Sequence, residues 1–147
     1  MNNVLVAAAH TDDEVIGCGG TIAKHVEAGD SVFVVFMTDG VTSREKYNSN
    51  EISERLTGAK EALHILGVKD SFFFDFPDNQ MDSIPLLTVT KAIESIVQKV
   101  SPNIVYTHFS GDLNVDHQVT HRAVMSACRP QSWCPVKEIY TFEILSS

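Results

Sequence analysis

The chain has 147 residues and a mass of 16.2 kDa, with 44% hydrophobic residues, 20% charged residues and a formal net charge of -8. This length suits one domain with a substantial core, and the composition excludes an intrinsically disordered chain. The acidic balance, with Lys and Arg scattered along the sequence, argues against nucleic acid or an anionic membrane as a partner. A small molecule or a glycan is the simpler partner.

The cysteines and the apolar segments indicate where such a protein works. Cys18, Cys128 and Cys134 are odd in number and lack CxxC spacing, so we expect thiols rather than a disulfide framework. The N-terminal apolar run is too short for a signal peptide, and no stretch reaches the roughly 18 to 20 apolar residues of a membrane-spanning helix. We therefore expect a cytoplasmic protein with one domain over residues 1–147.

The first half of the chain alternates apolar runs with helical patterns. Val4–Ala9 is continuously apolar, which predicts a strand buried on both faces. Gly17–Ala28 is predicted as a helix that Gly29 closes, and Ser31–Met37 as a second buried strand. Residues 41–50 are polar and are expected to form a loop on the active-site side.

The second half continues this alternation. Apolar residues recur at helical spacing in Ile52–Leu66, and the run Ser71–Phe76 predicts a third strand. The later predicted elements are a helix at Leu86–Val100, a strand at Asn103–Thr107, a helix at His117–Ala127 and a strand at Glu138–Leu145. Alternating strands and helices with short connections predict a three-layer, Rossmann-like α/β fold with a mainly parallel sheet.

Polar side chains gather where the predicted strands end. Residues 10–14 follow the first strand, Asp39 follows the second, Asp75 and Asp78 close the third, and residues 108–117 follow the fourth. Ligands of such folds bind beyond the carboxyl ends of the strands. The sequence therefore predicts a site at this edge.

The first group of chemically competent residues is His10 with Asp12, Asp13 and Glu14. Three consecutive carboxylates repel one another unless a cation lies nearby, and His10 and Asp13 are spaced to converge on one point. A histidine followed by an aspartate that caps a helix would give the same pattern. This motif alone leaves both interpretations open.

The second group surrounds His117, which follows Asp112, Asn114 and Asp116. Two imidazole nitrogens and one carboxylate oxygen with an open fourth position are typical of catalytic zinc. The other interpretation is that Asp112 and Asn114 cap the following helix and that His117 is a solvated residue in its first turn.

Together the two segments, AAHTDDEVIGCGGT at 8–21 and THFSGDLNVDHQVTHRA at 107–123, resemble the LmbE-like deacetylase family. This family includes the N-acetylglucosaminyl-phosphatidylinositol deacetylases (PIG-L). The resemblance extends to Arg55 and to the segment FPDN at 76–79.

The resemblance implies a zinc ion, or another divalent metal such as Fe²⁺, held by His10, Asp13 and His117. It further implies that Asp12 is the general base, in a reaction that removes an acetyl group from an N-acetylated amino sugar or its conjugate. Asn114 and Asp116 are expected to assist catalysis. The expected substrate-binding residues are Arg55, Asp78, His108 and Asp112.

The chain departs from the family at two positions. Thr11 replaces the usual proline between the histidine and the aspartate pair. Asn114 stands where many members have a histidine that acts as a cation, so either its amide suffices or His108 or His121 substitutes. Because members of the family are usually longer, we also consider a truncated C-terminus.

Two alternatives remain. Gly17-Cys18-Gly19-Gly20 followed by Asp39 is reminiscent of a Rossmann-type nucleotide-binding module, although the spacing is not GxGxxG. The other alternative is a catalytically weak or inactive scaffold member of the family that forms part of a homo-oligomer.

Overall fold

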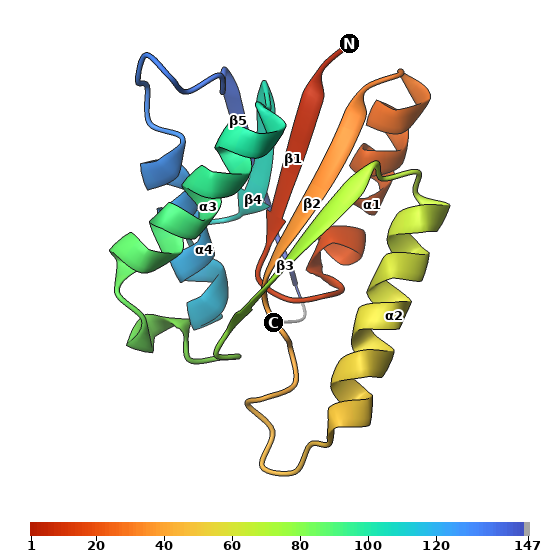
Figure 1. The fold of residues 1–147 in the computed structure, drawn as a ribbon, viewed down its shortest axis with the longest axis vertical. Coiled ribbons are helices and arrows are strands. Elements are labelled where there is room, and N and C mark those ends of the chain that lie inside the picture. Colours follow the sequence, from red (N-terminus) through yellow and green to blue (C-terminus); the bar gives the residue numbers. More distant parts are fainter. Residues whose placement is uncertain (146–147) are drawn as a thin grey trace.

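The computed structural model describes residues 1–145 and has one five-stranded parallel sheet with strand order β3-β2-β1-β4-β5 (Figure 1). Ser146 and Ser147 lie outside the described residues. The strands are β1 (Asn3–Ala8), β2 (Ser31–Thr38), β3 (Asp70–Phe76), β4 (Ile104–His108) and β5 (Glu138–Phe142). The helices are α1 (Asp13–Glu27), α2 (Ser49–Ile65), α3 (Leu86–Val100) and α4 (Val115–Ala127), with a short 3₁₀ helix, η1, at Met81–Ser83.

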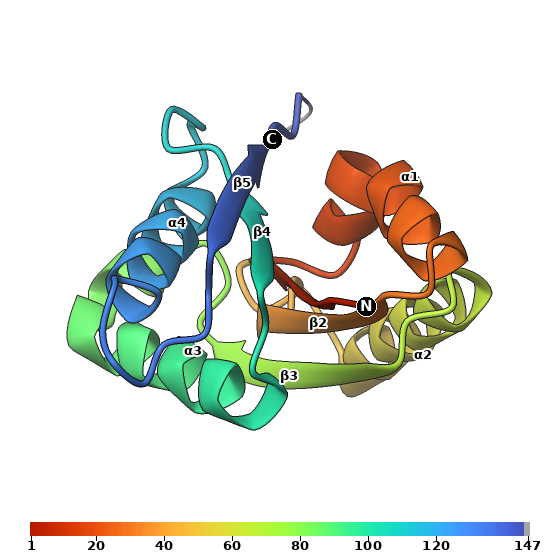
Figure 2. The same cartoon turned by 90° about the horizontal axis from the view of Figure 1, so that it is seen from above.

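The sheet is the central layer, with α1 and α2 on one face and α3 and α4 on the other (Figure 2). Alternate residues of β1 enter different cores: Leu5 packs in the cluster that contains α3 and α4, whereas Val4 and Val6 pack beside α1 and α2. A strand buried on both faces has no polar positions. This explains the continuous apolar run of the sequence and confirms the predicted three-layer α/β fold.

Among the predicted boundaries that differ from the structure, three have a local physical reason. Helix α1 begins at Asp13 rather than Gly17, because acidic side chains in a first turn favour the positive end of the helix dipole. Helix α4 begins at Val115 rather than His117, since Asn114 caps it by accepting from two backbone N–H groups. Strand β5 ends at Phe142 rather than Leu145, because its partner β4 ends at His108, opposite Phe142.

The glycines of the possible nucleotide motif lie within α1, after its first turn. A phosphate-binding loop needs its glycines before the helix, where backbone N–H groups are free. In this chain the positions at the start of that helix carry Asp12, Asp13 and Glu14. This arrangement argues against the nucleotide-binding alternative.

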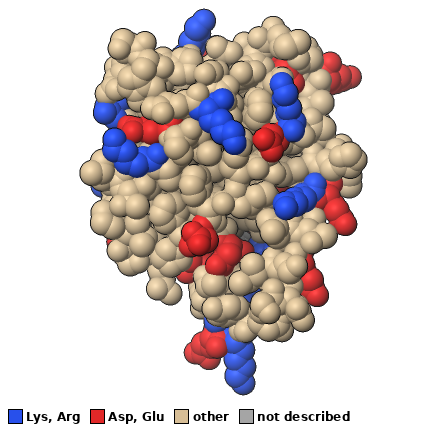
Figure 3. All heavy atoms as spheres, in the orientation of Figure 1, with Lys and Arg blue, Asp and Glu red and all other residues tan. Residues whose placement is uncertain are grey.

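Strand order places the candidate site at the centre of the sheet. From β1 the chain moves outward through β2 and β3 and then returns to pair β4 with the other edge of β1. The loops after β1 and β4 therefore meet at the point where the direction of the connections reverses. Among residues 1–145, no helix is long and apolar enough to cross a membrane. On the face drawn in Figure 3, Lys and Arg side chains are spread out and interspersed with acidic ones.

Candidate metal centre and active site

The loop after β1 is held tightly at both ends. The carbonyl of Ala9 accepts hydrogen bonds from the backbone N–H and the hydroxyl of Thr38, and the N–H of Ala9 donates to His108 Nε2. Asp12 has a φ of 142°, a strained conformation for a residue with a side chain. Its N–H donates to the carboxylate of Glu14 at 3.0 Å, which caps this turn. The loop thus presents His10 and Asp13 in fixed positions.

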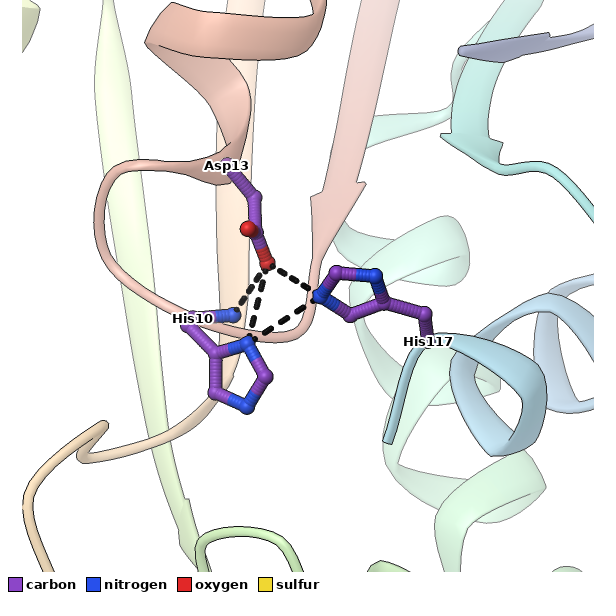
Figure 4. Close-up of side chains that lie close together, drawn as sticks. All are labelled: His10, Asp13 and His117. Atoms are coloured by element: carbon purple, nitrogen blue, oxygen red, sulfur yellow. Dashed lines mark hydrogen bonds and ion pairs between the residues drawn. The ribbon is translucent and has the colours of Figure 1, made fainter. Parts of the chain in front are cut away.

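Three side chains from two distant segments converge beyond the end of β1 (Figure 4). His10 Nδ1 lies 3.2 Å from Asp13 Oδ2 and 3.2 Å from His117 Nε2, and these last two atoms are 3.1 Å apart. A tetrahedral zinc site with bonds of about 2.0–2.1 Å spaces its ligand atoms about 3.3 Å apart. The three atoms form a triangle of the size that a divalent cation requires, and all three residues line one cavity.

Carboxylates on the far side of each imidazole fix which nitrogen is free to bind a metal. His117 Nδ1 lies 2.9 Å from Asp112 Oδ2, and His10 Nε2 lies 2.9 Å from Asp116 Oδ2. Because an ionised carboxylate can only accept, each of these nitrogens is the donor. In their neutral forms, His10 Nδ1 and His117 Nε2 therefore direct their lone pairs to the centre of the triangle, as in carboxylate–histidine–zinc arrangements.

The charges around the triangle suit a cation. Burial alone would lower the pKa of His10, but the carboxylates of Asp116, Asp13 and Asp78 raise that pKa to about 11. Burial would raise the pKa of Asp13, but three neighbouring imidazoles hold that pKa well below its usual range. The pKa of His117 is also raised, because the nearby carboxylates outweigh burial. The surrounding carboxylates therefore favour a positive charge at the centre of the triangle.

Asp12 lies beside the triangle without contributing an atom to it. Its side chain is 55% exposed, and its Oδ2 lies 3.5 Å from Arg55 Nη2. Burial and the negative charge of Asp13 raise the pKa of Asp12, while Arg55 opposes this shift. Arg55 also donates to the carbonyl oxygen of Thr11 at 2.9 Å and to its hydroxyl at 3.3 Å. The hydroxyl of the threonine that replaces the family proline thus helps to hold Arg55.

The cavity at this edge has a volume of about 280 Å³ and is lined mainly by polar residues. Ser43 donates to Asp78 Oδ2 at 2.6 Å, and this contact together with His10 lowers the pKa of Asp78 to about 2 despite burial. Asn114 Nδ2 donates to Asn79 Oδ1 at 3.1 Å. The full lining is His10, Asp12, Asp13, Ile16, Gly40, Ser43, Arg44, Arg55, Asp78, Asn79, Asn114, His117 and Ile144.

Two of the expected substrate-binding residues do not line this cavity. His108 is fully buried, with its ring stacked on that of His117 at 3.8 Å between centroids, and burial lowers its pKa. Asp112, in the loop before α4, contacts His117 from behind, as described above. Asp116 is also fully buried behind His10. These three residues contact the imidazoles of the triangle from behind, whereas Arg55 and Asp78 line the cavity.

The other histidines lie away from the triangle. His121 Nδ1 bonds to the carbonyl oxygen of His108, and His25 lies between Asp30 and Tyr106 beside the other end of α1. His121 therefore does not take the place of the family histidine. Sequence patterns missed Ser43, Arg44 and Asn79, although the polar loop 41–50 and the FPDN turn were signals that could have pointed to them.

The family of the chain follows from its sequence as a whole. The profile of the PIG-L family, described as GlcNAc-PI de-N-acetylase, matches residues 5–128, which include all three residues of the triangle. The chain belongs to the PIG-L family. This confirms the resemblance inferred from the two motifs.

Individual PIG-L relatives agree with this assignment. The chain is 30% identical over 131 residues to the uncharacterized deacetylase YaiS of Escherichia coli, covering 86% of this chain and 68% of YaiS. The structure of N,N'-diacetylchitobiose deacetylase from Pyrococcus horikoshii matches with a TM-score of 0.76 and 30% identity, over 86% of this chain and 49% of that chain. The chain is also 30% identical over 138 residues to 4-oxalmesaconate hydratase of Pseudomonas putida, covering 86% of this chain and 52% of the hydratase.

The chain spans about half to two thirds of the length of these PIG-L relatives. The fold and the candidate metal group lie within the shared part, since the profile match includes them. Family members and neighbours are deacetylases that hydrolyse amides, with the hydratase as a relative of different chemistry.

Proposed function

We propose that this chain is a divalent-metal-dependent N-deacetylase acting on an N-acetylated amino sugar or its conjugate, with zinc as the metal. The observation that carries the proposal is the triangle of His10 Nδ1, Asp13 Oδ2 and His117 Nε2, with the exposed carboxylate of Asp12 beside it. Names of relatives support the substrate class, since they include deacetylases of diacetylchitobiose and of N-acetyl-alpha-D-glucosaminyl L-malate.

The donor set favours zinc over other divalent metals. Two neutral imidazoles and one carboxylate, with a side open to the cavity, are the composition of catalytic zinc sites, and Fe²⁺ is the second choice. When bound, such a cation supplies a Lewis acid that makes water nucleophilic near neutral pH and withdraws charge from the amide carbonyl.

Asp12 is the proposed general base. Its carboxylate lines the cavity, does not belong to the ligand triangle, and has a pKa raised by burial and by Asp13, which makes it a better proton acceptor than an ordinary aspartate. It takes a proton from the attacking water and returns one to the amine as the carbon–nitrogen bond breaks. Water and amide are thereby converted to acetate and a free amino sugar.

Asn114 is proposed to donate a hydrogen bond to the tetrahedral intermediate, in place of the family histidine. Its Oδ1 is committed to capping α4, where it accepts from the N–H groups of Asp116 and His117, so only Nδ2 points away from the helix. That nitrogen cannot supply charge. In the described lining of the cavity, the residues of Lys or Arg type are Arg44 and Arg55. Together with Asp78, they are proposed to bind the sugar hydroxyls.

The hydratase relative provides the competing hypothesis. In this hypothesis the same metal group activates water for addition to a carbon–carbon double bond. The proposal of an N-acetylated amino sugar as substrate would then be wrong. A catalytically inactive scaffold is the other alternative, and Asn114 is the feature that favours it.

Acetate release separates these possibilities. Metal-analysed protein is incubated with N-acetylglucosamine glycosides, with diacetylchitobiose and with 4-oxalmesaconate, alongside an Asp12→Asn variant. We expect acetate from at least one acetylated sugar, a loss of about 10²-fold or more in kcat for Asp12→Asn, and unchanged metal content. Turnover of the hydratase substrate alone, or metal-loaded protein with no turnover of any substrate, would contradict the proposal.

A further inference from the structure

An apolar groove adjoins the polar cavity on the far side of Asp12 and Arg55. It has a volume of about 340 Å³, and its walls are the first turn of α1 and the middle of α2. Asp12, Ile16 and Arg55 belong to the linings of both spaces, so the groove continues directly from the candidate active site. The complete lining is Thr11, Asp12, Glu14, Val15, Ile16, Arg55, Gly58, Ala59 and Ala62.

Two large apolar side chains of α1 are exposed along the groove. Val15 is 41% exposed and Ile16 59% exposed, on adjacent positions of α1 at the mouth of the candidate active site. Opposite them, α2 presents Gly58, Ala59 and Ala62, whose small side chains leave the space open. Contiguous apolar surface beside a polar cavity is typical of a binding site for an amphiphilic ligand.

One carboxylate in the lining of the groove has a buried oxygen without a hydrogen-bond partner among the described residues. Glu14 is fully buried, and its Oε1 has no hydrogen-bond partner within residues 1–145, while its Oε2 accepts from the N–H of Asp12. A buried polar atom without a partner is rare in folded proteins and calls for an explanation. This observation is independent of the apolar walls.

The position of Asp12 indicates which part of a substrate reaches the groove. If Asp12 returns a proton to the departing amine, the nitrogen side of the scissile bond faces Asp12, and the acetyl methyl points away from it. The sugar then lies toward Asp12 and Arg55, and its substituent at the anomeric carbon continues past them. The groove beyond these two residues therefore lies on the aglycone side.

We propose that this groove binds an apolar aglycone, so that the substrate is an N-acetylated amino sugar attached to an alkyl or aryl group. The inference rests on the proposed function, since it uses the orientation that the deacetylation reaction imposes. Polar residues of the cavity hold the sugar, and the apolar wall between α1 and α2 holds its substituent.

Gly58 offers a clean test of this proposal. It is exposed on α2, and a Cβ added there meets no atom within 4 Å, so the first atom of a side chain fits there without a clash. Gly58→Phe fills the groove, and Gly58→Ala is the matched control that adds a methyl group and removes the glycine from the helix. The substrates are the octyl and methyl β-glycosides of N-acetylglucosamine, together with the methyl glycoside of N-octanoylglucosamine.

We expect the wild-type KM for the octyl glycoside to be about tenfold or more below that for the methyl glycoside. Gly58→Phe should raise the octyl KM to the methyl value and leave the methyl glycoside unaffected, and Gly58→Ala should keep most of the preference. Equal KM values in the wild type, or a preference that survives Gly58→Phe, would overturn the proposal. A Gly58-sensitive preference for the octanoyl substrate instead would assign the groove to the acyl chain and overturn the aglycone assignment.

Calorimetry on chelator-treated protein separates this proposal from the proposed function. If chelator-treated protein binds the octyl glycoside more tightly than the methyl glycoside and Gly58→Phe removes the difference, while metal-loaded protein releases acetate from neither, the groove stands and the deacetylase assignment fails. Equal binding of the two glycosides, with acetate released from both by metal-loaded protein, would leave the deacetylase assignment standing and overturn the groove proposal.

Discussion

His10 Nε2 donates to Asp116 Oδ2 at 2.9 Å, and this contact joins the loop after β1 to the first turn of α4. The same carboxylate also accepts from the backbone N–H of Asn79 at 2.6 Å and of Met81 at 3.0 Å. One buried aspartate therefore fixes the orientation of His10, a candidate metal ligand, and the position of the turn after β3 that borders the cavity.

Replacing Asp116 with asparagine is expected to weaken metal binding by about 10- to 100-fold. The carboxylate accepts from three N–H donors, whereas an amide must turn its own NH₂ toward one of them. Competition with a chromophoric chelator measures the affinity for zinc. Asp82→Asn, at an exposed position one residue after Met81, is the control and should bind zinc as the wild type does. Equal affinities for the two variants would show that Asp116 does not orient His10.

The metal affinity should rise with pH through neutrality. In the metal-free protein the pKa of His10 is about 11, so His10 carries a proton below that pH and must release it when a cation binds. One released proton corresponds to about a tenfold increase in apparent affinity per pH unit. Calorimetry in buffers of different ionisation enthalpy counts the protons. Affinity that is constant between pH 6 and pH 8 would contradict the assignment of His10 as a ligand.

Glu14 is expected to make the metal-free protein less stable as pH rises. Burial raises its pKa from 4.5 to about 7, so the folded state binds more protons than the unfolded state between these values. Stability from this group is therefore complete below pH 4.5 and is lost as pH rises through 7, by up to about 3 kcal/mol. Urea unfolding of wild type and Glu14→Gln tests this: the variant should gain relative stability from pH 4.5 to 7. A constant difference between the two would contradict it.

Gly17 marks the contact between α1 and the end of β5. A Cβ at this position would lie 2.3 Å from the ring of Phe142, so Gly17→Ala should destabilise the fold by about 1–3 kcal/mol. Gly20→Ala is the matched control in the same helix, because its Cβ meets nothing within 4 Å, and it should stabilise by about 0.5–1 kcal/mol. Chemical denaturation gives both values, and a neutral Gly17→Ala would show that Phe142 moves aside freely.

Local patterns in the sequence were sufficient for the fold class. Apolar runs such as residues 4–9 predicted the strands, and apolar residues at helical spacing predicted the helices. This works because a strand buried on both faces is continuously apolar, and a helix buried on one face is apolar at every third or fourth residue. Ends of elements were less predictable. The start of α1 depends on a turn that Glu14 caps, and the end of β5 depends on the length of β4.

The candidate site was predictable only where a motif carried it. His10, Asp13 and His117 converge as expected. The burial of His108 and Asp112 depends on how β4 and α4 pack, which no local pattern encodes. Ser43 and Arg44 reach the cavity through the course of a polar loop. Such positions follow from tertiary geometry rather than from spacing along the chain.

Anomalous diffraction at the zinc absorption edge, from crystals grown with zinc, tests the central claim most directly. The account predicts one strong peak within about 2.0–2.2 Å of His10 Nδ1, Asp13 Oδ2 and His117 Nε2, and no peak there in His117→Ala crystals. Zinc bound elsewhere while this triangle stays empty, or an unchanged peak in the variant, would contradict it.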